Sequence, residues 1–320
     1  MGPTLLCAQT KASFEGAALR APDAQGIRIA AAAARHGGKD ALFGVAAAFA
    51  HAAFAAPETA RAVYAAFCAG WLGGGTMIAM PAAAAAPLSR PFWDAFWDLF
   101  VDHGPSDPLA ITGRVVALGG KLDPSLIARG ERVATRHPKA GDPAHQPIPP
   151  RLTLEQLKHL PQGSLGHDFW RLIVDNRFDL EVLDREALRL SALPPALRFL
   201  NTRILQMHDV WHLMGPFETT ALHEVAISAF QQAQFGHGYS AMFLAVVVGR
   251  LAFDGGESAP VILDTIADAS RHGEESPSFM AIPWEAEWHR PAAEIRARHG
   301  LVPFGARHPA DIFERFRPAA

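Results

Sequence analysis

Apolar residues recur at steps of three and four through most of this 320-residue chain, whereas alternating runs of β-branched residues are nearly absent. Steps of three and four place apolar side chains on one face of a helix, while a half-buried strand needs strict alternation. The pattern therefore predicts an all-α fold. Hydrophobic residues make up 49% of the chain, enough to bury a sizeable core in one large domain or two ordinary ones.

Turn residues divide this pattern into separate helices. The pair Pro194-Pro195 opens a helix that Gly215 ends, and Thr153 and Gln156 stand at the spacing of a capping box. We expect helices at residues 41–56, 57–71, 92–101, 123–135, 165–176, 195–214 and 219–235.

The helix expected at 92–101 carries a stripe of aromatic residues. We interpret this stripe as core packing, with contact to a membrane surface as the weaker alternative. Its members are Phe92, Trp93, Phe96, Trp97 and Phe100.

Composition divides the chain into five parts. The stretch 137–151 contains five prolines and predicts an extended linker. It separates an N-terminal helical part (36–136) from a second helical part (152–303). Residues 1–35 form an N-terminal extension and residues 304–320 a C-terminal tail.

Charge and cysteine content exclude several classes of protein. A net charge of −3 gives no sign of the basic stripe of a nucleic-acid-binding protein. Cys7 and Cys68 cannot make a disulfide framework, so we expect a reducing, cytoplasmic setting. The N-terminus lacks a signal-peptide pattern. The uncharged runs 63–89 and 225–249 are interrupted by glycine, proline or polar residues, and predict core helices or walls of an apolar cavity rather than membrane spans.

The stretch HDVWHLMGPFETTALHE, from His208 to Glu224, gathers ligand-type residues. His208 and His212 are four residues apart, so on a helix their side chains lie about 40° apart and one turn apart. Both border the apolar face and should point inward. Glu224 follows the Gly-Pro break and can return on an antiparallel neighbouring helix. Asp209 can supply a ligand oxygen, a supporting hydrogen bond or a proton.

Two imidazole nitrogens with one or two carboxylate oxygens suit zinc or another first-row divalent ion, with positions left for a substrate. A bare HxxxH also arises by chance in a chain with 15 histidines, and then marks only buried polar residues. We expect His223 on the helix surface rather than among the ligands. Spacing alone leaves the two interpretations open.

The flanks of this stretch resemble a known family. HDVWH, eleven further residues and Glu224 resemble the HDxxHx11E signature of the coenzyme Q biosynthesis protein 4 family. Upstream, LEQLKHLPQGSLGHDFWRLIVDNRFD resembles the family's LPxGSLG segment, and downstream IPWEAEWHRPAAEIRARHGL resembles its Trp-Glu ending. The resemblance covers about residues 152–302. It departs from the family at His223, where a small residue is usual, at Gly215, which comes one residue early, and in a longer linker.

The resemblance implies a role in ubiquinone synthesis. Such proteins are associated with oxidative decarboxylation at C1 of a polyprenylated hydroxybenzoate, where hydroxyl replaces carboxyl. It implies a helical homodimer, peripheral to a membrane, with an apolar cavity for the isoprenoid tail beside a metal site between antiparallel helices. The Ala-, Pro- and Arg-rich composition is typical of a GC-rich bacterium, so we expect this membrane to be the inner membrane of a bacterium. The expected partners are the polyprenylated quinone precursor and other enzymes of the pathway.

The expected metal is zinc, with other first-row divalent ions or Mg²⁺ as alternatives. The ligands are His208, Asp209, His212 and Glu224, and the catalytic residues are Asp209 and His208.

Two other functions compete with this one. A non-catalytic lipid-binding scaffold would use a closed, structural metal site, whereas an enzyme needs an open coordination position. A metallohydrolase of the HD type would need an upstream histidine and a later aspartate as further ligands, and the chain shows no phosphate-binding cradle. The residues on offer are His159 or His167, and Asp254 or Asp264, none with a supporting pattern.

Overall fold

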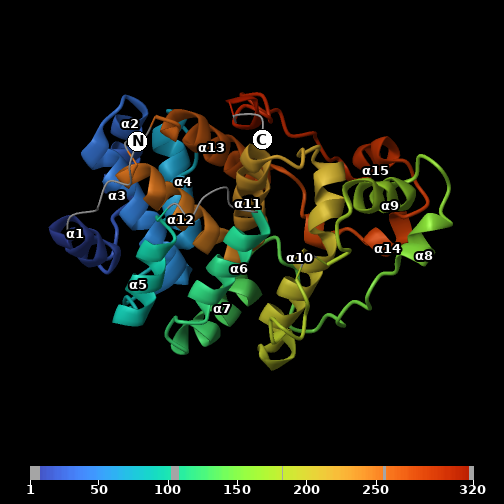
Figure 1. The fold of residues 1–320 in the computed structure, drawn as a ribbon, viewed down its shortest axis with the longest axis horizontal. Helices are drawn as coiled ribbons and strands as arrows, with labels where there is room; N and C mark the ends of the chain where they lie inside the picture. Colours follow the sequence, from blue (N-terminus) through green and yellow to red (C-terminus); the bar gives the residue numbers. More distant parts are fainter. Residues whose placement is uncertain (1–7, 102–107, 182, 255–256, 317–320) are drawn as a thin grey trace.

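The computed structural model describes residues 8–101, 108–181, 183–254 and 257–316. Within these ranges the chain forms helices and turns and contains no β-strand, so the prediction of an all-α fold is confirmed (Figure 1). The helices are α1 (Ala8–Ala18), α2 (Ala24–Arg35), α3 (Lys39–Ala50), α4 (Ala60–Trp71), α5 (Arg90–Asp98), α6 (Pro108–Gly119), α7 (Ser125–Arg136), α8 (Leu154–Lys158), α9 (Leu165–Asn176), α10 (Pro195–Met214), α11 (Ala221–Phe235), α12 (Gly238–Phe253), α13 (Ala259–Glu275), α14 (Trp284–Glu287) and α15 (Ala292–His299). Short 3-10 or π segments lie at His51–Ala55, Pro57–Thr59, Leu190–Ala192, Phe279–Ala281 and Glu314–Phe316.

All seven helices predicted from the sequence are present, with ends shifted by a few residues. The helix expected at 41–56 is α3 followed by a π turn, and the one expected at 57–71 is a 3-10 turn followed by α4. The capping box at Thr153 is confirmed. The sequence pattern alone does not delimit α1, α2, α6, α12 and α13.

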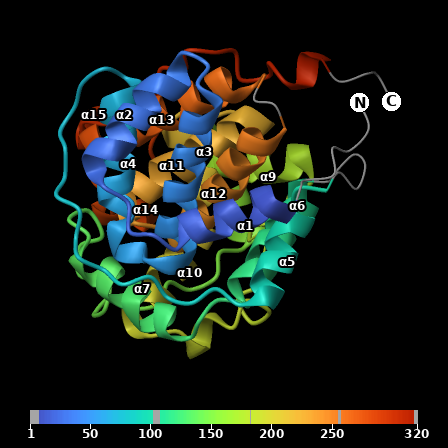
Figure 2. The same ribbon diagram turned by 90° about the vertical axis from the view of Figure 1, so that its left-hand side faces the viewer.

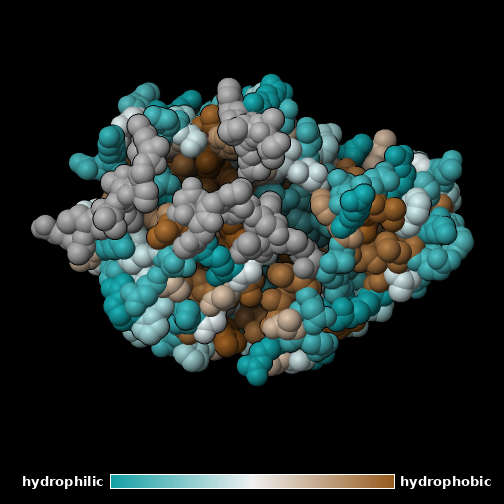
Figure 3. All heavy atoms as spheres, viewed as in Figure 1, coloured by the Kyte–Doolittle hydropathy of each residue, from teal (hydrophilic) through white to brown (hydrophobic). Residues whose placement is uncertain are grey.

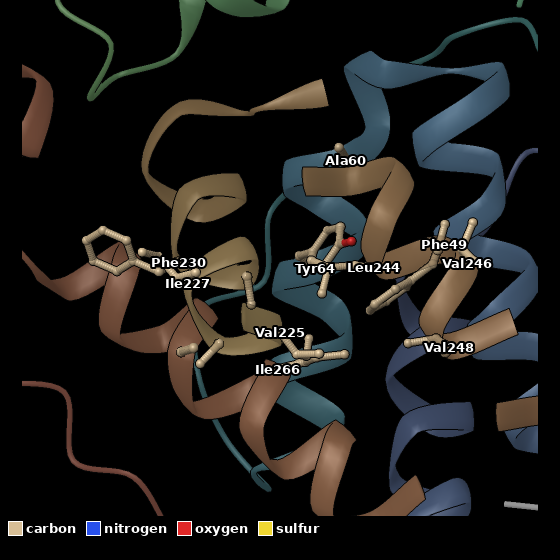
Figure 4. Close-up of a cluster of buried hydrophobic side chains, with 14 of the residues drawn as sticks. Phe49, Ala60, Tyr64, Val225, Ile227, Phe230, Leu244, Val246, Val248 and Ile266 are labelled. Carbon is tan, nitrogen blue, oxygen red and sulfur yellow. The ribbon is translucent and has the colours of Figure 1, made fainter. Parts of the chain in front are cut away.

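Helix α11 lies at the centre of the fold, packed against α13 and α12, with α4 also in contact. Every residue from 222 to 235 is buried except Glu224. Figure 4 shows Val225 close to Ile266 of α13, and Tyr64 of α4 beside Leu244 of α12. The uncharged run 225–249 therefore forms core helices, as one of the two readings of the sequence predicted.

The aromatic stripe of α5 and the turn after it is buried, each member being 8% exposed or less. The ring of Phe14 in α1 contacts the rings of Trp93, Phe96 and Trp97. The ring of Phe253 in α12 also contacts Trp97. The interpretation of the stripe as core packing is confirmed. Figure 2 shows α1 and α5 on the same side of the molecule, so part of the N-terminal extension belongs to this core.

The two segments flanking the histidine motif in the sequence lie together in space. The backbone N–H of Gly166, at the start of α9, donates to the carbonyl of Trp288 at 3.0 Å. A Cβ at position 166 would lie only 2.1 Å from a side-chain atom of Leu160, which explains the glycine. Helices α8, α9, α14 and α15 gather at one end of the molecule, and α10 lies between them and the rest (Figure 1).

The proline-rich stretch 137–151 contains no helix but is fixed to the core. The Lys139 ammonium donates to the carbonyls of Gly273 (2.7 Å) and Ser276 (2.6 Å), at the C-terminal end of α13. The amide of Gln206 donates to the Pro150 carbonyl. Residues 138–140 and 142–146 form turns and bends, and residues 147–151 have no regular structure, so the expectation of an extended linker is wrong for most of the stretch, which packs as part of the structure. The division of the chain into five parts stays a prediction.

No described helix combines the length and the apolar character needed to cross a membrane. Cys7 lies outside the described residues. Cys68 is a free thiol, and burial raises its pKa to about 12, so it is not a reactive nucleophile.

We predict that His137 makes the protein sensitive to acid. This residue follows α7, is 7% exposed, and has a pKa lowered to about 4, first by burial and then by the charge of Arg61. Between pH 6.5 and 4 the unfolded chain binds a proton at this ring while the folded protein does not, so stability is lost as the pH falls. His137→Asn keeps an acceptor near the Nδ1 position and should reduce the acid loss by about 2–3 kcal/mol. Urea unfolding of both proteins from pH 7.5 to 4.5 measures this, and parallel curves would contradict it.

Candidate metal site

A short turn brings the end of α10 and the start of α11 together. α10 carries His208 and His212 and ends at Gly215. α11 begins after Thr220, whose side chain accepts a hydrogen bond from the N–H of His223. Glu224 consequently lies in the first turn of α11, opposite the last turns of α10.

Three side chains converge across this turn. The Nε2 atoms of His208 and His212 lie 3.1 Å apart. Each Nε2 lies 3.4 Å from a different carboxylate oxygen of Glu224. The side chain of His212 is 2% exposed, that of His208 27% and that of Glu224 41%. The site is therefore closed behind His212 and open to solvent at Glu224.

Two contacts show that α11 runs in the opposite sense to α10. His212 meets Glu224, near the start of α11, and His208 meets Gln231, seven residues further on. The C-terminal end of α10 therefore lies beside the N-terminal end of α11. The expected antiparallel placement of Glu224 against His212 is confirmed.

The separations are compatible with one metal ion between the three side chains. Ligand atoms held about 2.0–2.1 Å from a tetrahedral zinc ion lie about 3.3 Å from one another. The two Nε2 atoms lie 3.1 Å apart, each lies 3.4 Å from a different Glu224 oxygen, and one ligand atom from each residue lies within 4.8 Å of the others. The described part of the chain contains one group of three or more residues placed to bind a metal, and these residues form it. Three protein ligands leave a tetrahedral ion one open position.

Hydrogen bonding prepares His212 as a ligand. Its Nδ1 lies 2.9 Å from the Phe217 carbonyl, which can only accept, so Nδ1 carries the hydrogen. The Nε2 lone pair of His212 is then free to face His208 and Glu224. Gly215 makes this arrangement possible, because a Cβ there would lie 2.4 Å from the ring of Phe217.

Glu224 and His208 shift each other's pKa in opposite directions. Burial favours a raised pKa for the Glu224 carboxyl, but the hydrogen bonds and charges of His208 and His212 outweigh it and hold the pKa well below its usual range. Burial favours a lowered pKa for His208, but the hydrogen bond and charge of Glu224, together with the charge of Asp209, raise it. A divalent ion would replace the proton of His208.

Asp209 lies beside His208 but is not one of the converging residues. Burial raises the pKa of its carboxyl, against the lowering effect of the charges of His208 and His212. Its assignments as a metal ligand and as a proton-transfer residue both stay predictions.

The expectation that His223 lies on the helix surface is wrong. This side chain is 4% exposed, and its Nδ1 accepts a hydrogen bond from the N–H of Glu218 at 2.7 Å. Its ring packs near Phe217 and Phe304. The C-terminal segment carrying Phe304 covers this face of α11, which position along the helix could not reveal.

The further ligands required by an HD-type metallohydrolase lie elsewhere. Their side chains have other partners: Glu155 for His159, Trp170 for His167, Arg250 for Asp254, and Trp71, Arg307 and His308 for Asp264.

Sequence reasoning missed the contact of Gln231 with His208. The signal was present, because Gln231 lies two helical turns after Glu224 on the same face of α11. One surface hollow lies between α1 and α5, and another lies between α12 and α13. Neither hollow includes a residue of the site. The apolar cavity beside the site stays a prediction.

The fold and the site together define an all-α protein with a two-histidine, one-carboxylate candidate metal site. The family model described as coenzyme Q (ubiquinone) biosynthesis protein Coq4 matches residues 148–304, which include every residue of that site. This region of the chain is similar to the Coq4 family, and the resemblance noted in the sequence is confirmed over residues 148–304.

Two curated relatives each match about half of the chain. The mitochondrial ubiquinone biosynthesis protein COQ4 homolog of Rattus norvegicus is 25% identical over 152 residues, which is 48% of this chain and 56% of the relative. The Homo sapiens homolog is 23% identical over 151 residues, covering 47% and 55%. The chain thus spans little more than half the length of these relatives.

A crystal structure from Nostoc punctiforme, provisionally described as a ubiquinone biosynthesis protein, aligns at 21% identity with a TM-score of 0.48. It covers 66% of this chain and 96% of that one.

We predict that Gly215→Ala disturbs the site through the turn. The new Cβ would force Phe217 away and remove the carbonyl that orients His212, at a cost of about 1–3 kcal/mol for overpacking. Urea unfolding and zinc titration should show both lower stability and weaker binding. Gly113→Ala on α6 is the control, because a Cβ there meets nothing within 4 Å. Wild-type stability and zinc affinity in Gly215→Ala would contradict the account.

Proposed function

We propose that this protein acts in ubiquinone biosynthesis as a metal-dependent enzyme. The proposed reaction is oxidative decarboxylation at C1 of a polyprenylated hydroxybenzoate, in which hydroxyl replaces carboxyl. One observation carries the proposal: two imidazole Nε2 atoms and a solvent-reachable carboxylate converge within the region that matches the Coq4 family. The chain spans about half of its curated relatives, so their activity is carried over as a hypothesis.

His208, His212 and Glu224 would hold a divalent ion, with zinc first among the candidates for two nitrogens and a carboxylate. Such an ion would act as a Lewis acid on the carboxylate or phenolate oxygen of the ring. His212 is fixed by the Phe217 carbonyl, and Glu224 neutralises part of the metal charge. Asp209, beside His208, would hold or release the proton exchanged with the ring.

The reaction releases the carboxyl group as carbon dioxide and requires an oxygen donor for the new hydroxyl group. None of the residues of the site can supply this oxygen atom. We propose dioxygen as the donor together with a two-electron reductant, which converts the second oxygen atom to water. An assay must therefore compare aerobic and anaerobic conditions, each with and without an added reductant.

An isoprenoid tail requires an apolar surface beside the site. Helix α12 follows α11 and carries the partly buried apolar side chains of Tyr239, Met242 and Phe243, and we propose that the tail lies against this face. Exposed Leu154, Val174 and Phe178 lie on or next to α8 and α9, toward the end of the molecule where Figure 3 shows hydrophobic surface. We propose that this end rests on the inner membrane of a bacterium, with the protein otherwise cytoplasmic.

We also propose a homodimer that contacts other enzymes of the pathway. A non-catalytic scaffold is the competing function. The open coordination position left by three converging ligands favours the enzyme.

We predict that His208→Ala abolishes metal binding. An imidazole supplies a large share of a total affinity that reaches about 10–16 kcal/mol in structural zinc sites. Metal content by mass spectrometry and turnover should both fall to background, whereas His159→Ala, on exposed α8, should change neither. Full metal and full turnover in His208→Ala would reject the site. If metal is lost while ubiquinone synthesis in cells stays normal, the proposed enzymatic function is wrong and the scaffold function is favoured.

Asp209→Asn preserves size and removes the charge. We expect it to retain metal and fold but to reduce turnover about 10²- to 10⁴-fold, the usual contribution of general acid–base catalysis. The control is Asp175→Asn on α9, an exposed carboxylate paired with Arg171. The measurement is the yield of decarboxylated, hydroxylated product by mass spectrometry. Turnover of Asp209→Asn equal to that of the control would exclude Asp209 from the chemistry.

A further inference from the structure

A buried chain of hydrogen bonds leads away from His208. The side-chain amide of Gln231 lies 2.9 Å from His208 Nδ1. Ser240 Oγ lies 3.2 Å from Gln231 Oε1 and 2.9 Å from His237 Nδ1. Gln231 is 2% exposed and Ser240 is fully buried. This series of hydrogen bonds thus crosses from α10 to α11 and on to the start of α12.

The polar side chains of Gln231 and Ser240 lie in the apolar core, where burying a polar atom costs free energy. Gln231 and Ser240 belong to the uncharged run that forms the core, and burying an amide or a hydroxyl is costly unless it is hydrogen-bonded. The two side chains satisfy each other, and at one end the hydrogen-bonded chain terminates on His208. What distinguishes Gln231 from the equally buried Gln232 is this contact with His208.

We propose that Gln231, held in place by Ser240, is a positioning residue that fixes the tautomer and the ring orientation of His208 for a divalent metal. The inference rests on the metal site proposed above. A metal-binding imidazole usually donates its other N–H to an acceptor, which orients the ring and strengthens the ligand. His208 faces Glu224 and His212 through Nε2, so its Nδ1 must carry the hydrogen when Nε2 binds a metal.

Each hydrogen bond in this series, from His208 through Gln231 and Ser240 to His237, can exchange its donor and its acceptor. With Gln231 Nε2 donating to Nδ1, the hydrogen of His208 lies on Nε2 and points toward Glu224. A half-turn of the amide places Oε1 against Nδ1–H and frees the Nε2 lone pair for a metal. Ser240 then accepts from the amide and donates to His237. An amide, a hydroxyl and an imidazole all permit this exchange, whereas an ammonium or a guanidinium would lock one direction.

The test is a metal titration of near-isosteric variants. Gln231→Met removes the amide and keeps the length of the side chain. Gln232→Met is the matched control on the same helix: Gln232 is equally buried, and no described residue hydrogen-bonds with its side chain. Metal-free proteins are titrated with zinc against a chromophoric chelator. We expect Gln231→Met to bind zinc about 10- to 100-fold more weakly than the wild type, and Gln232→Met to bind like the wild type.

Gln231→Glu decides between positioning and simple structural damage. Its carboxylate accepts from Nδ1–H, so it should restore zinc affinity to within a few-fold of the wild type, or exceed it. The visible spectrum of the cobalt-loaded protein should stay that of the wild type in Gln231→Glu and change in Gln231→Met. These readouts do not depend on turnover.

The outcomes are separable. If the wild type binds no zinc, the proposed function fails. If the wild type binds zinc and Gln231→Met binds it equally well, the positioning role is overturned and the metal site stands. Equal weakening in Gln231→Met and Gln232→Met, or no recovery in Gln231→Glu, also overturns it.

Discussion

The burial of α11 determines where each polar group of the site can lie. This helix contacts α13, α12 and α4, and from residue 222 to 235 Glu224 alone is not buried. A carboxylate on such a helix needs compensation, which the two imidazoles of α10 provide across a short turn. Gly215 allows that turn to close on Phe217, whose carbonyl orients His212. Core packing and candidate chemistry therefore depend on the same few contacts.

The Coq4 match is compatible with either an enzyme or a scaffold. Three candidate ligands converge where a closed zinc site would need four, and solvent reaches them at Glu224. Asp209 stands beside them with a raised pKa. An open coordination position would favour the proposed enzyme, and a closed one the scaffold.

Local signals in the sequence predicted much of the structure. Helical spacing, the capping box at Thr153 and the break at Gly215 depend on neighbouring residues, and each was found as expected. The meeting of His208, His212 and Glu224 was also predictable, because one turn joins their helices. What failed depends on distant contacts. His223 is buried because the segment around Phe304 returns to cover it. The role of Gln231 requires knowing how α11 faces α10.

The coordination shell of the bound metal tests the central claim most directly. X-ray absorption at the zinc edge, on protein loaded with one equivalent of zinc, should show two imidazole nitrogens. It should also show one or two oxygen ligands, in a four-coordinate shell at about 2.0–2.1 Å. A shell of oxygen ligands without imidazole scattering would contradict the account.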